Sequence, residues 1–257
     1  MGASFDLYLR RDTAIHRLDP RVKLAFVIEA TFLTFLWPHL EMALGMIGIC
    51  VLGLWRARIP AARVVGILRV IGPLMAMVFV LTAIFGPREG ALIAAGPFAV
   101  TAASVARGAL LALRLLVLAL IVFLWLFTTD QASIVRGFVA LGVPYEWGLT
   151  LALALRYLPL FAVLFEQVRD AQQARGLDLE QRSFIGRLRA YQPVLVAMII
   201  SALRNSEHLG WALEARAVGA TRGRRSVFRP LQLRPEDRIV LGLLGLVLAV
   251  GVALRLL

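Results

Sequence analysis

Two short elements in the second half of the chain combine one arginine with small neighbours. The tripeptide Ala174-Arg175-Gly176 has a counterpart in Ala215-Arg216-Ala217, and each follows another alanine three positions upstream. An arginine carries five N–H donors in a planar fork that matches a carboxylate and also suits backbone carbonyls. Small neighbours keep a helix end slim enough to enter a groove on another protein. The pattern therefore predicts docking to a protein partner, and the predicted contact residues are Ala174, Arg175, Gly176, Ala215, Arg216 and Ala217.

A purely structural interpretation of each element also exists. A cation near a helix C-terminus is favoured by the helix dipole, and a glycine after it is an ordinary cap. We expect Gly176 to supply a left-handed cap for the first helix and Gly219 to end the second. The repetition of the element on two helices is what favours docking.

Motifs for catalysis or cofactor binding are not found in the sequence. It has no G-x-x-x-x-G-K-[ST] loop for ATP phosphates and no His-Glu-x-x-His or cysteine pair for a metal. Its histidines, His16, His39 and His208, lie in three separate segments, and Cys50 lies in an apolar run. We therefore predict a non-enzymatic protein that holds no cofactor or metal itself.

Composition places these elements in a membrane protein. Of 257 residues, 60% are hydrophobic and 17% charged, yet the formal net charge is +12. A soluble domain is closer to half apolar. The arginines are scattered between long apolar runs, which argues against a nucleic-acid-binding domain.

Five apolar runs are candidate membrane spans, which need about 20 residues each. They are Val22–Trp37, Leu40–Trp55, Val64–Phe85, Pro97–Thr128 and Ile239–Leu254. The sequence thus predicts an all-α polytopic protein with about five transmembrane helices. We divide it into a membrane domain of four spans (1–128), a cytosolic-side coupling domain (129–237) and a C-terminal span (238–257).

Loop charge sets the orientation. The segment before the first span and the loop between the second and third are rich in arginine. In the turns Trp37–Glu41 and Gly86–Gly90, by contrast, Arg88 is the only arginine or lysine. Basic loops stay in the cytoplasm. We therefore expect a multi-pass protein of the cell membrane with a cytoplasmic N-terminus.

The segment Trp147–Phe165 has two possible placements. It is long enough to span, but Arg156 and Pro159 near its middle favour a helix at the membrane interface, since a central arginine costs at least about 2.5 kcal/mol. The apolar run Val194–Leu203 is about half a span. Two long interfacial helices account for both runs.

Several of these elements together resemble the transmembrane T component of energy-coupling factor transporters, the EcfT or CbiQ family. The resemblance covers most of the chain and rests on five pieces in order. They are Ile15–Leu24, Thr128-Thr129, Leu153–Leu160, Ala171–Gly176 and Ala212–Arg216.

The resemblance implies a membrane domain and a cytosolic coupling domain in which two long helices cross. It implies that Arg175 and Arg216 dock into two ATP-binding-cassette subunits, which hold ATP and magnesium. The crossing helices would cradle a small membrane protein, the S component, that captures a vitamin or a cobalt or nickel ion. ATP-driven motion of the helices would topple this component and release its cargo inward. Ala217 replaces the family glycine; alanine suits a helical conformation there but not a positive φ.

A self-contained channel or secondary transporter is the alternative. Glu29, Arg69, Arg107 and Arg114 fall in or near spans, and ionisable residues there are functional candidates. Against this alternative, no inverted repeat or pair of broken helices is visible. A membrane-embedded enzyme is not supported, because no catalytic constellation is present.

Overall fold

The computed structural model describes residues 8–9, 11–85, 91–95, 98–179, 183–218, 231 and 233–256. The chain forms two compact units. Unit 1 comprises Met1–Phe5 and Leu149–Pro230, and unit 2 comprises Asp6–Gly148 and Leu231–Leu257. The predicted boundaries of the membrane domain, the coupling domain and the C-terminal span, at residues 128 and 237, remain a prediction.

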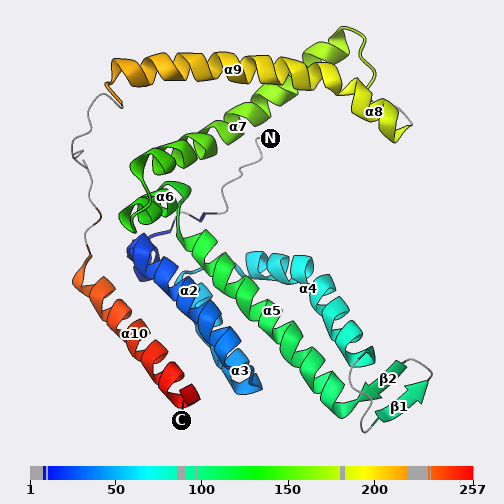
Figure 1. Ribbon diagram of the computed structural model, residues 1–257, viewed down its shortest axis with the longest axis vertical. Helices are drawn as coiled ribbons and strands as arrows, with labels where there is room; N and C mark the ends of the chain where they lie inside the picture. The colour runs from blue at the N-terminus through cyan, green and yellow to red at the C-terminus, as the bar shows by residue number, and fades with distance from the viewer. Residues whose placement is uncertain are drawn as a thin grey trace. The chain divides into compact units, whose positions relative to one another are not determined.

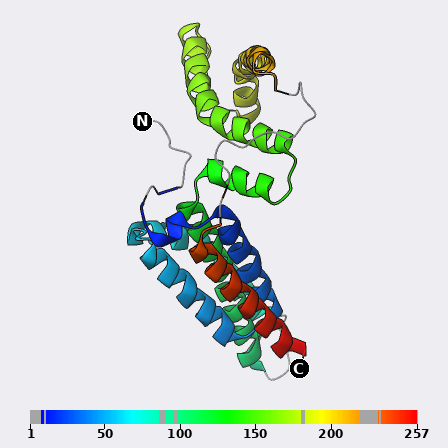
Figure 2. The same cartoon turned by 90° about the vertical axis from the view of Figure 1, so that its left-hand side faces the viewer.

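Unit 2 is a helical bundle in which α2, α3, α5 and α10 run side by side (Figures 1 and 2). Its helices are α1 (Ala14–Arg17), α2 (Pro20–Leu36), α3 (Leu40–Arg56), α4 (Ala61–Ile84), α5 (Ala102–Thr128), α6 (Gln131–Ala140) and α10 (Pro235–Leu256). The core lies between α2, α3 and α5, where Leu33, Cys50 and Ile121 are fully enclosed. Burial of Cys50 agrees with its position in an apolar run.

The start of α5 differs from the predicted span Pro97–Thr128. A short antiparallel hairpin of β1 (Ala91–Ala95) and β2 (Phe98–Thr101) precedes the helix, with Ala95 paired to Phe98. Thr101 and Ser104 then form a reciprocal capping box, with Ser104 N–H donating to Thr101 Oγ1 (2.9 Å) and Thr101 N–H to Ser104 Oγ (3.0 Å). Because this cap satisfies free amides of the first turn, the helix begins at Ala102. The predicted turn Gly86–Gly90 lies outside the described residues.

Unit 1 contains α7 (Tyr145–Ala174), whose first turn belongs to unit 2, followed by α8 (Phe184–Ala190) and α9 (Gln192–Ala215). Helices α7 and α9 cross in Figure 1, and the rings of Phe165 and Tyr191 stack there with centroids 6.3 Å apart. The C-terminal ends of the two helices lie on opposite sides of this crossing. The predicted pair of long helices is thus observed.

Three of the described helices are long and apolar enough to cross a membrane, namely α4, α5 and α7. Helices α2 and α3, with 17 residues each, are at the lower limit for a span. The predicted class, an all-α polytopic membrane protein, is confirmed. Length and composition permit α7 to cross, so the interfacial placement of Trp147–Phe165 remains a prediction.

Candidate docking tips

The first predicted contact element, Ala174-Arg175-Gly176, forms the C-terminal end of α7 and is called the first tip. Gly176 has a φ of +89°. Gly176 N–H donates to Gln173 O (2.9 Å), and Leu177 N–H donates to Gln172 O (3.1 Å). This pair of bonds is the Schellman motif, which satisfies carbonyls that the helix leaves free. The predicted left-handed cap at Gly176 is confirmed.

The second element, Ala215-Arg216-Ala217, is the second tip and ends α9 in the same way. Ala217 N–H donates to Glu214 O (2.8 Å), and Val218 N–H donates to Leu213 O (3.0 Å). Ala217 has a φ of +54°, so an alanine occupies the left-handed position that glycine holds in the first tip. The prediction that Gly219 ends this helix is wrong, because α9 is already closed by Ala217. Gly219 itself lies outside the described residues.

Both tips present their arginine in the same position of the same motif. Arg175 and Arg216 are the last residues before the left-handed one, and all six tip residues are exposed. Among the described residues, the two ion pairs are Arg17–Asp12 and Arg169–Asp170, so neither tip arginine has a carboxylate partner there. The helix dipole favours a cation at this end. Each tip therefore presents an exposed guanidinium that has no carboxylate partner in the described part of the chain.

The helices that carry the tips expose apolar side chains. Ile199 and Leu203 on α9 are 59% and 61% exposed. The exposed apolar residues of α7 include Leu151, Leu158, Leu160 and Val163, and those of α9 also include Leu195, Val196 and Ile200. Such faces need lipid or another protein to cover them.

A buried polar network, defined by Asp19, Lys23, Thr128 and Asp237, holds one end of unit 2 together. Lys23 Nζ donates to Thr128 O (2.7 Å) and to His16 O (3.2 Å). Asp237 accepts from Asp19 N–H (3.0 Å) with one oxygen, and Arg234 N–H donates to the other (2.8 Å). Lys23 therefore connects α1 and α2 to the end of α5, and Asp237 connects α10 to the start of α2.

The sequence analysis included three of these four residues but gave none of them a role. Asp19, Lys23 and Thr128 fall in the segments that carry the family resemblance, but no role followed from them. Asp237 was missed, although an acidic residue in the first turn of a helix is a recognisable signal. What separates it from Glu236 is burial, since Asp237 is only 1% exposed.

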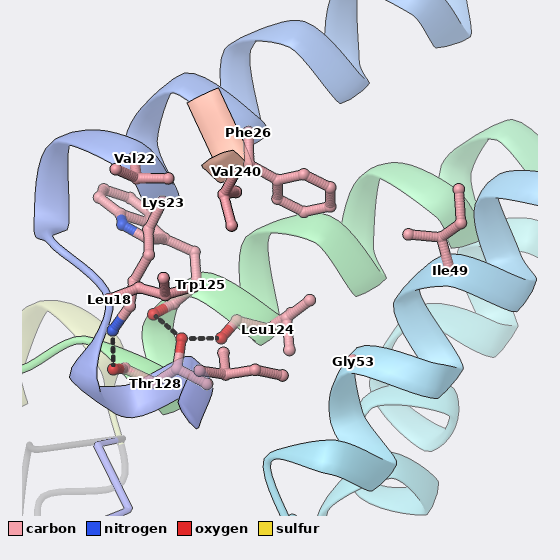
Figure 3. A pocket seen from close by; sticks show the side chains of 11 residues that line it. Leu18, Val22, Lys23, Phe26, Ile49, Gly53, Leu124, Trp125, Thr128 and Val240 are labelled. Carbon is pink, nitrogen blue, oxygen red and sulfur yellow. Dashed lines mark hydrogen bonds between the residues drawn. The ribbon is translucent and has the colours of Figure 1, made fainter. Parts of the chain in front are cut away.

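A cavity of about 180 Å³ adjoins this network, and its lining is almost wholly apolar (Figure 3). Phe26, Ile49 and Leu124 line it, and Lys23 reaches Thr128 at its edge. The amine of Lys23 is thus engaged by protein carbonyls. Nothing in the lining resembles a set of metal ligands, and no group of three or more His, Cys, Asp or Glu residues gathers within the part of the chain that the structure describes.

In the segment that precedes α2, His16 and Asp12 have lowered pKa values. Burial and the positive charge of Lys23 lower the pKa of His16 from its ordinary value. The hydrogen bonds and charge of Arg17 lower the pKa of Asp12, whose two oxygens accept from Arg17 Nε (2.6 Å) and Nη2 (2.7 Å). Both groups lie in the segment before α2 and bond to partners within that segment.

The ionisable residues that raised the alternative of a channel or secondary transporter differ in their surroundings. Glu29 is buried in α2, whereas Arg69 and Arg107 are exposed on α4 and α5. The Arg114 guanidinium lies over the Phe35 ring, 5.1 Å from its centroid. The four residues thus lie on three helices, with one side chain buried and two exposed.

The fold and the tips together define a helical membrane protein with a separate unit that presents two arginine-bearing helix ends. A family model described as "Cobalt transport protein", CbiQ, matches residues 11–224. The chain belongs to this family, the EcfT/CbiQ transmembrane components of energy-coupling factor transporters.

Individual relatives agree with this assignment. The chain is 31% identical over 245 residues to the energy-coupling factor transporter transmembrane protein EcfT of Heliobacterium modesticaldum, covering 91% of this chain and 90% of that protein. The EcfT protein of Bacillus subtilis is 28% identical over 244 residues, covering 91% of each chain. A putative ABC transporter ATP-binding protein of Bifidobacterium longum is 30% identical over 252 residues, which are 94% of this chain but 32% of that protein.

Proposed function

We propose that this chain is the scaffold that transmits ATP-driven motion from two ABC-type ATPase subunits to a substrate-binding S component. The transported substrate is a vitamin or a transition-metal ion, captured by the S component. The chain itself is not an enzyme; its ATPase partners bind ATP and magnesium and carry out hydrolysis. It resides in the cell membrane with its N-terminus in the cytoplasm, on the side where the ATPases lie.

The observation that carries the proposal is the equivalence of the two tips. Arg175 and Arg216 occupy the same position of the same capping motif, and both are exposed without a carboxylate partner among the described residues. One tip for each ATPase accounts for the duplication. Arginine is a frequent anchor of protein interfaces, because its fork can bind carboxylates and carbonyls.

The Bifidobacterium relative supports an ATPase as the partner class. In that protein a region similar to nearly all of this chain makes up about a third of a polypeptide described as an ABC transporter ATP-binding protein. Sequences joined in one polypeptide in one organism commonly act together when separate. The exposed apolar faces of α7 and α9 are suited to a membrane partner that slides over them.

A pull-down tests the tips. The chain is co-expressed with candidate ABC ATPase subunits from its own genome. ATPase capture is then compared between wild type, Arg175→Ala/Arg216→Ala and the matched control Arg189→Ala/Arg204→Ala. The control removes two exposed arginines from α8 and α9 outside the tips. We expect the tip variant to lose capture while inserting normally into the membrane, and the control to retain it.

If the tip variant captured the ATPases at the wild-type level, the docking assignment would be refuted. The same preparation addresses the alternative function. The scaffold proposal expects two ATPase chains and a small membrane protein to copurify, whereas a channel or secondary transporter would purify alone or as a homo-oligomer.

A further inference from the structure

Helix α8 is a short arm at the start of α9 in unit 1 (Figure 1). One side of the arm is packed. Ala190, its last residue, is buried, and the ring of Tyr191, which follows, stacks on Phe165 of α7. Val194, in the first turn of α9, is fully buried. The end of α8 is therefore held at the crossing of α7 and α9.

The other side of α8 exposes aliphatic side chains. Ile185 and Leu188 are 62% and 63% exposed. They lie three positions apart, and because each residue turns an α-helix by about 100°, they project on the same side. Ala190 is two positions from Leu188, so it projects about 160° away from it. The aliphatic pair thus faces away from the packed side of the arm.

Two arginines border this pair. Arg187 and Arg189 flank Leu188 in sequence, so they project about 100° to either side of it. Both side chains are exposed, and neither belongs to the two ion pairs among the described residues. The side chains of Ile185, Arg187, Leu188 and Arg189 are called the α8 face.

The sequence around α8 is basic. Between Glu180 and Glu207 the chain has no aspartate or glutamate. The same stretch holds four arginines, namely Arg182, Arg187, Arg189 and Arg204. Because no acidic residue of this stretch offsets the charge of the α8 face, the face favours an anionic partner.

A phospholipid surface fits the α8 face better than another protein does. In a protein interface of standard size each partner buries about 800 Å² and contributes about 20–30 residues, far more than four side chains supply. In an interfacial helix, by contrast, aliphatic side chains enter the acyl boundary while arginines extend to the headgroups. The chain is a membrane protein, so a bilayer surface is its constant neighbour.

We propose that the α8 face binds the surface of a bilayer that contains anionic phospholipids. Ile185 and Leu188 enter the surface, and Arg187 and Arg189 bind lipid phosphates. This contact involves unit 1 and lipid alone. It goes beyond the function proposed above and does not rest on it.

Spin labels in the full-length chain, reconstituted into nanodiscs, test the contact. In a Cys50→Ala background a nitroxide is attached at Ile185→Cys, and its collisions with oxygen, which concentrates in lipid, are compared with those of a water-soluble nickel chelate. In nanodiscs that contain phosphatidylglycerol, the label should meet oxygen and be protected from nickel. A label at Ser183→Cys, which projects about 160° from Ile185, should stay accessible to nickel.

The variant Arg187→Gln/Arg189→Gln tests the role of charge. Each arginine near an anionic surface favours the bound state about fivefold, equivalent to about 1 kcal/mol, so loss of both should lower the ratio of bound to free α8 about 30-fold. Nanodiscs of phosphatidylcholine alone should weaken binding in the same way. The matched control is Arg175→Gln/Arg216→Gln, which removes two exposed arginines from the tips of the same unit and should leave the label protected.

Three results would overturn the proposal. They are a label at position 185 that nickel reaches in anionic nanodiscs, equal protection in the wild type and the Arg187→Gln/Arg189→Gln variant, and equal protection in phosphatidylcholine. If the label became protected only after ATPases were added, α8 would belong to a protein interface and the lipid contact would be wrong. Arg187→Gln/Arg189→Gln should capture the ATPases at the wild-type level, because its tips are intact. Lipid contact and ATPase docking therefore succeed or fail in separate measurements.

Discussion

The substitution Ala217→Gly is predicted to stabilise the end of α9. Ala217 has a φ of +54°, and a left-handed conformation costs a residue with a Cβ atom about 1–2 kcal/mol. Glycine removes this strain, but its greater conformational freedom in the unfolded chain reduces the stabilisation by about 0.4–1 kcal/mol. The net gain is about 0.5–1 kcal/mol, which corresponds to a two- to fivefold less frequent opening of the last turn.

Hydrogen exchange measures this opening at single amides. The amides of Ala217 and Val218 donate to Glu214 O and Leu213 O, so their exchange should slow two- to fivefold in Ala217→Gly. The reciprocal change Gly176→Ala should accelerate exchange at Gly176 and Leu177. A Cβ there meets nothing within 4 Å, so the reciprocal effect isolates the backbone conformation.

Two results would contradict this reasoning. Faster exchange in Ala217→Gly would mean that the left-handed alanine is not strained, and no change in Gly176→Ala would mean that φ is not what limits the cap. Because Arg216 is untouched, ATPase capture should persist in Ala217→Gly. A loss of capture would show that the methyl of Ala217 is itself part of the contact.

The buried network and the N-terminal segment give two further predictions. Asp237→Ala leaves the buried Asp19 amide without an acceptor and should destabilise the protein by about 1–3 kcal/mol, seen as a lower Tm in detergent, whereas Asp237→Asn keeps an acceptor oxygen and should lose less. His16 has a lowered pKa in the folded protein. Its contribution to the free energy of unfolding is therefore fully present above its unfolded pKa of about 6.5 and declines as the pH falls below that value. Tm should therefore drop more between pH 7.5 and 5.5 in wild type than in His16→Gln; equal drops would contradict this assignment.

Much of the architecture was predictable because it depends on local pattern. Long apolar runs mark helices in any context, and the predicted runs match α2, α3, α4 and α10 to within a few residues. The start of α5 was missed because the apolar stretch continues backward through β2, and an apolar run alone does not distinguish strand from helix. The reciprocal Thr101–Ser104 cap, a matter of side-chain geometry, decides the boundary.

The tips were also visible in sequence, because a repeated Ala-Arg element on two helices is a pattern along the chain. That both tips end in the same capping motif was not visible in the sequence. Gly219 was the expected end of α9, since glycine is the usual left-handed residue, yet Ala217 takes that conformation. Residue type alone would argue against a left-handed conformation at an alanine. The hydrogen bond from Val218 N–H to Leu213 O offsets the strain of this conformation.

The amino-acid sequence by itself determined the membrane class, the family and the position of the two arginines, because hydrophobicity, charge and short motifs are properties of neighbouring residues. Only the tertiary structure decided that Asp237 meets Asp19 and that Gly148 meets Val139. Asp19 and Asp237 are 218 residues apart in the chain. Contacts of this kind depend on how helices pack, and a glycine or an aspartate becomes essential only when a particular neighbour comes within reach of it.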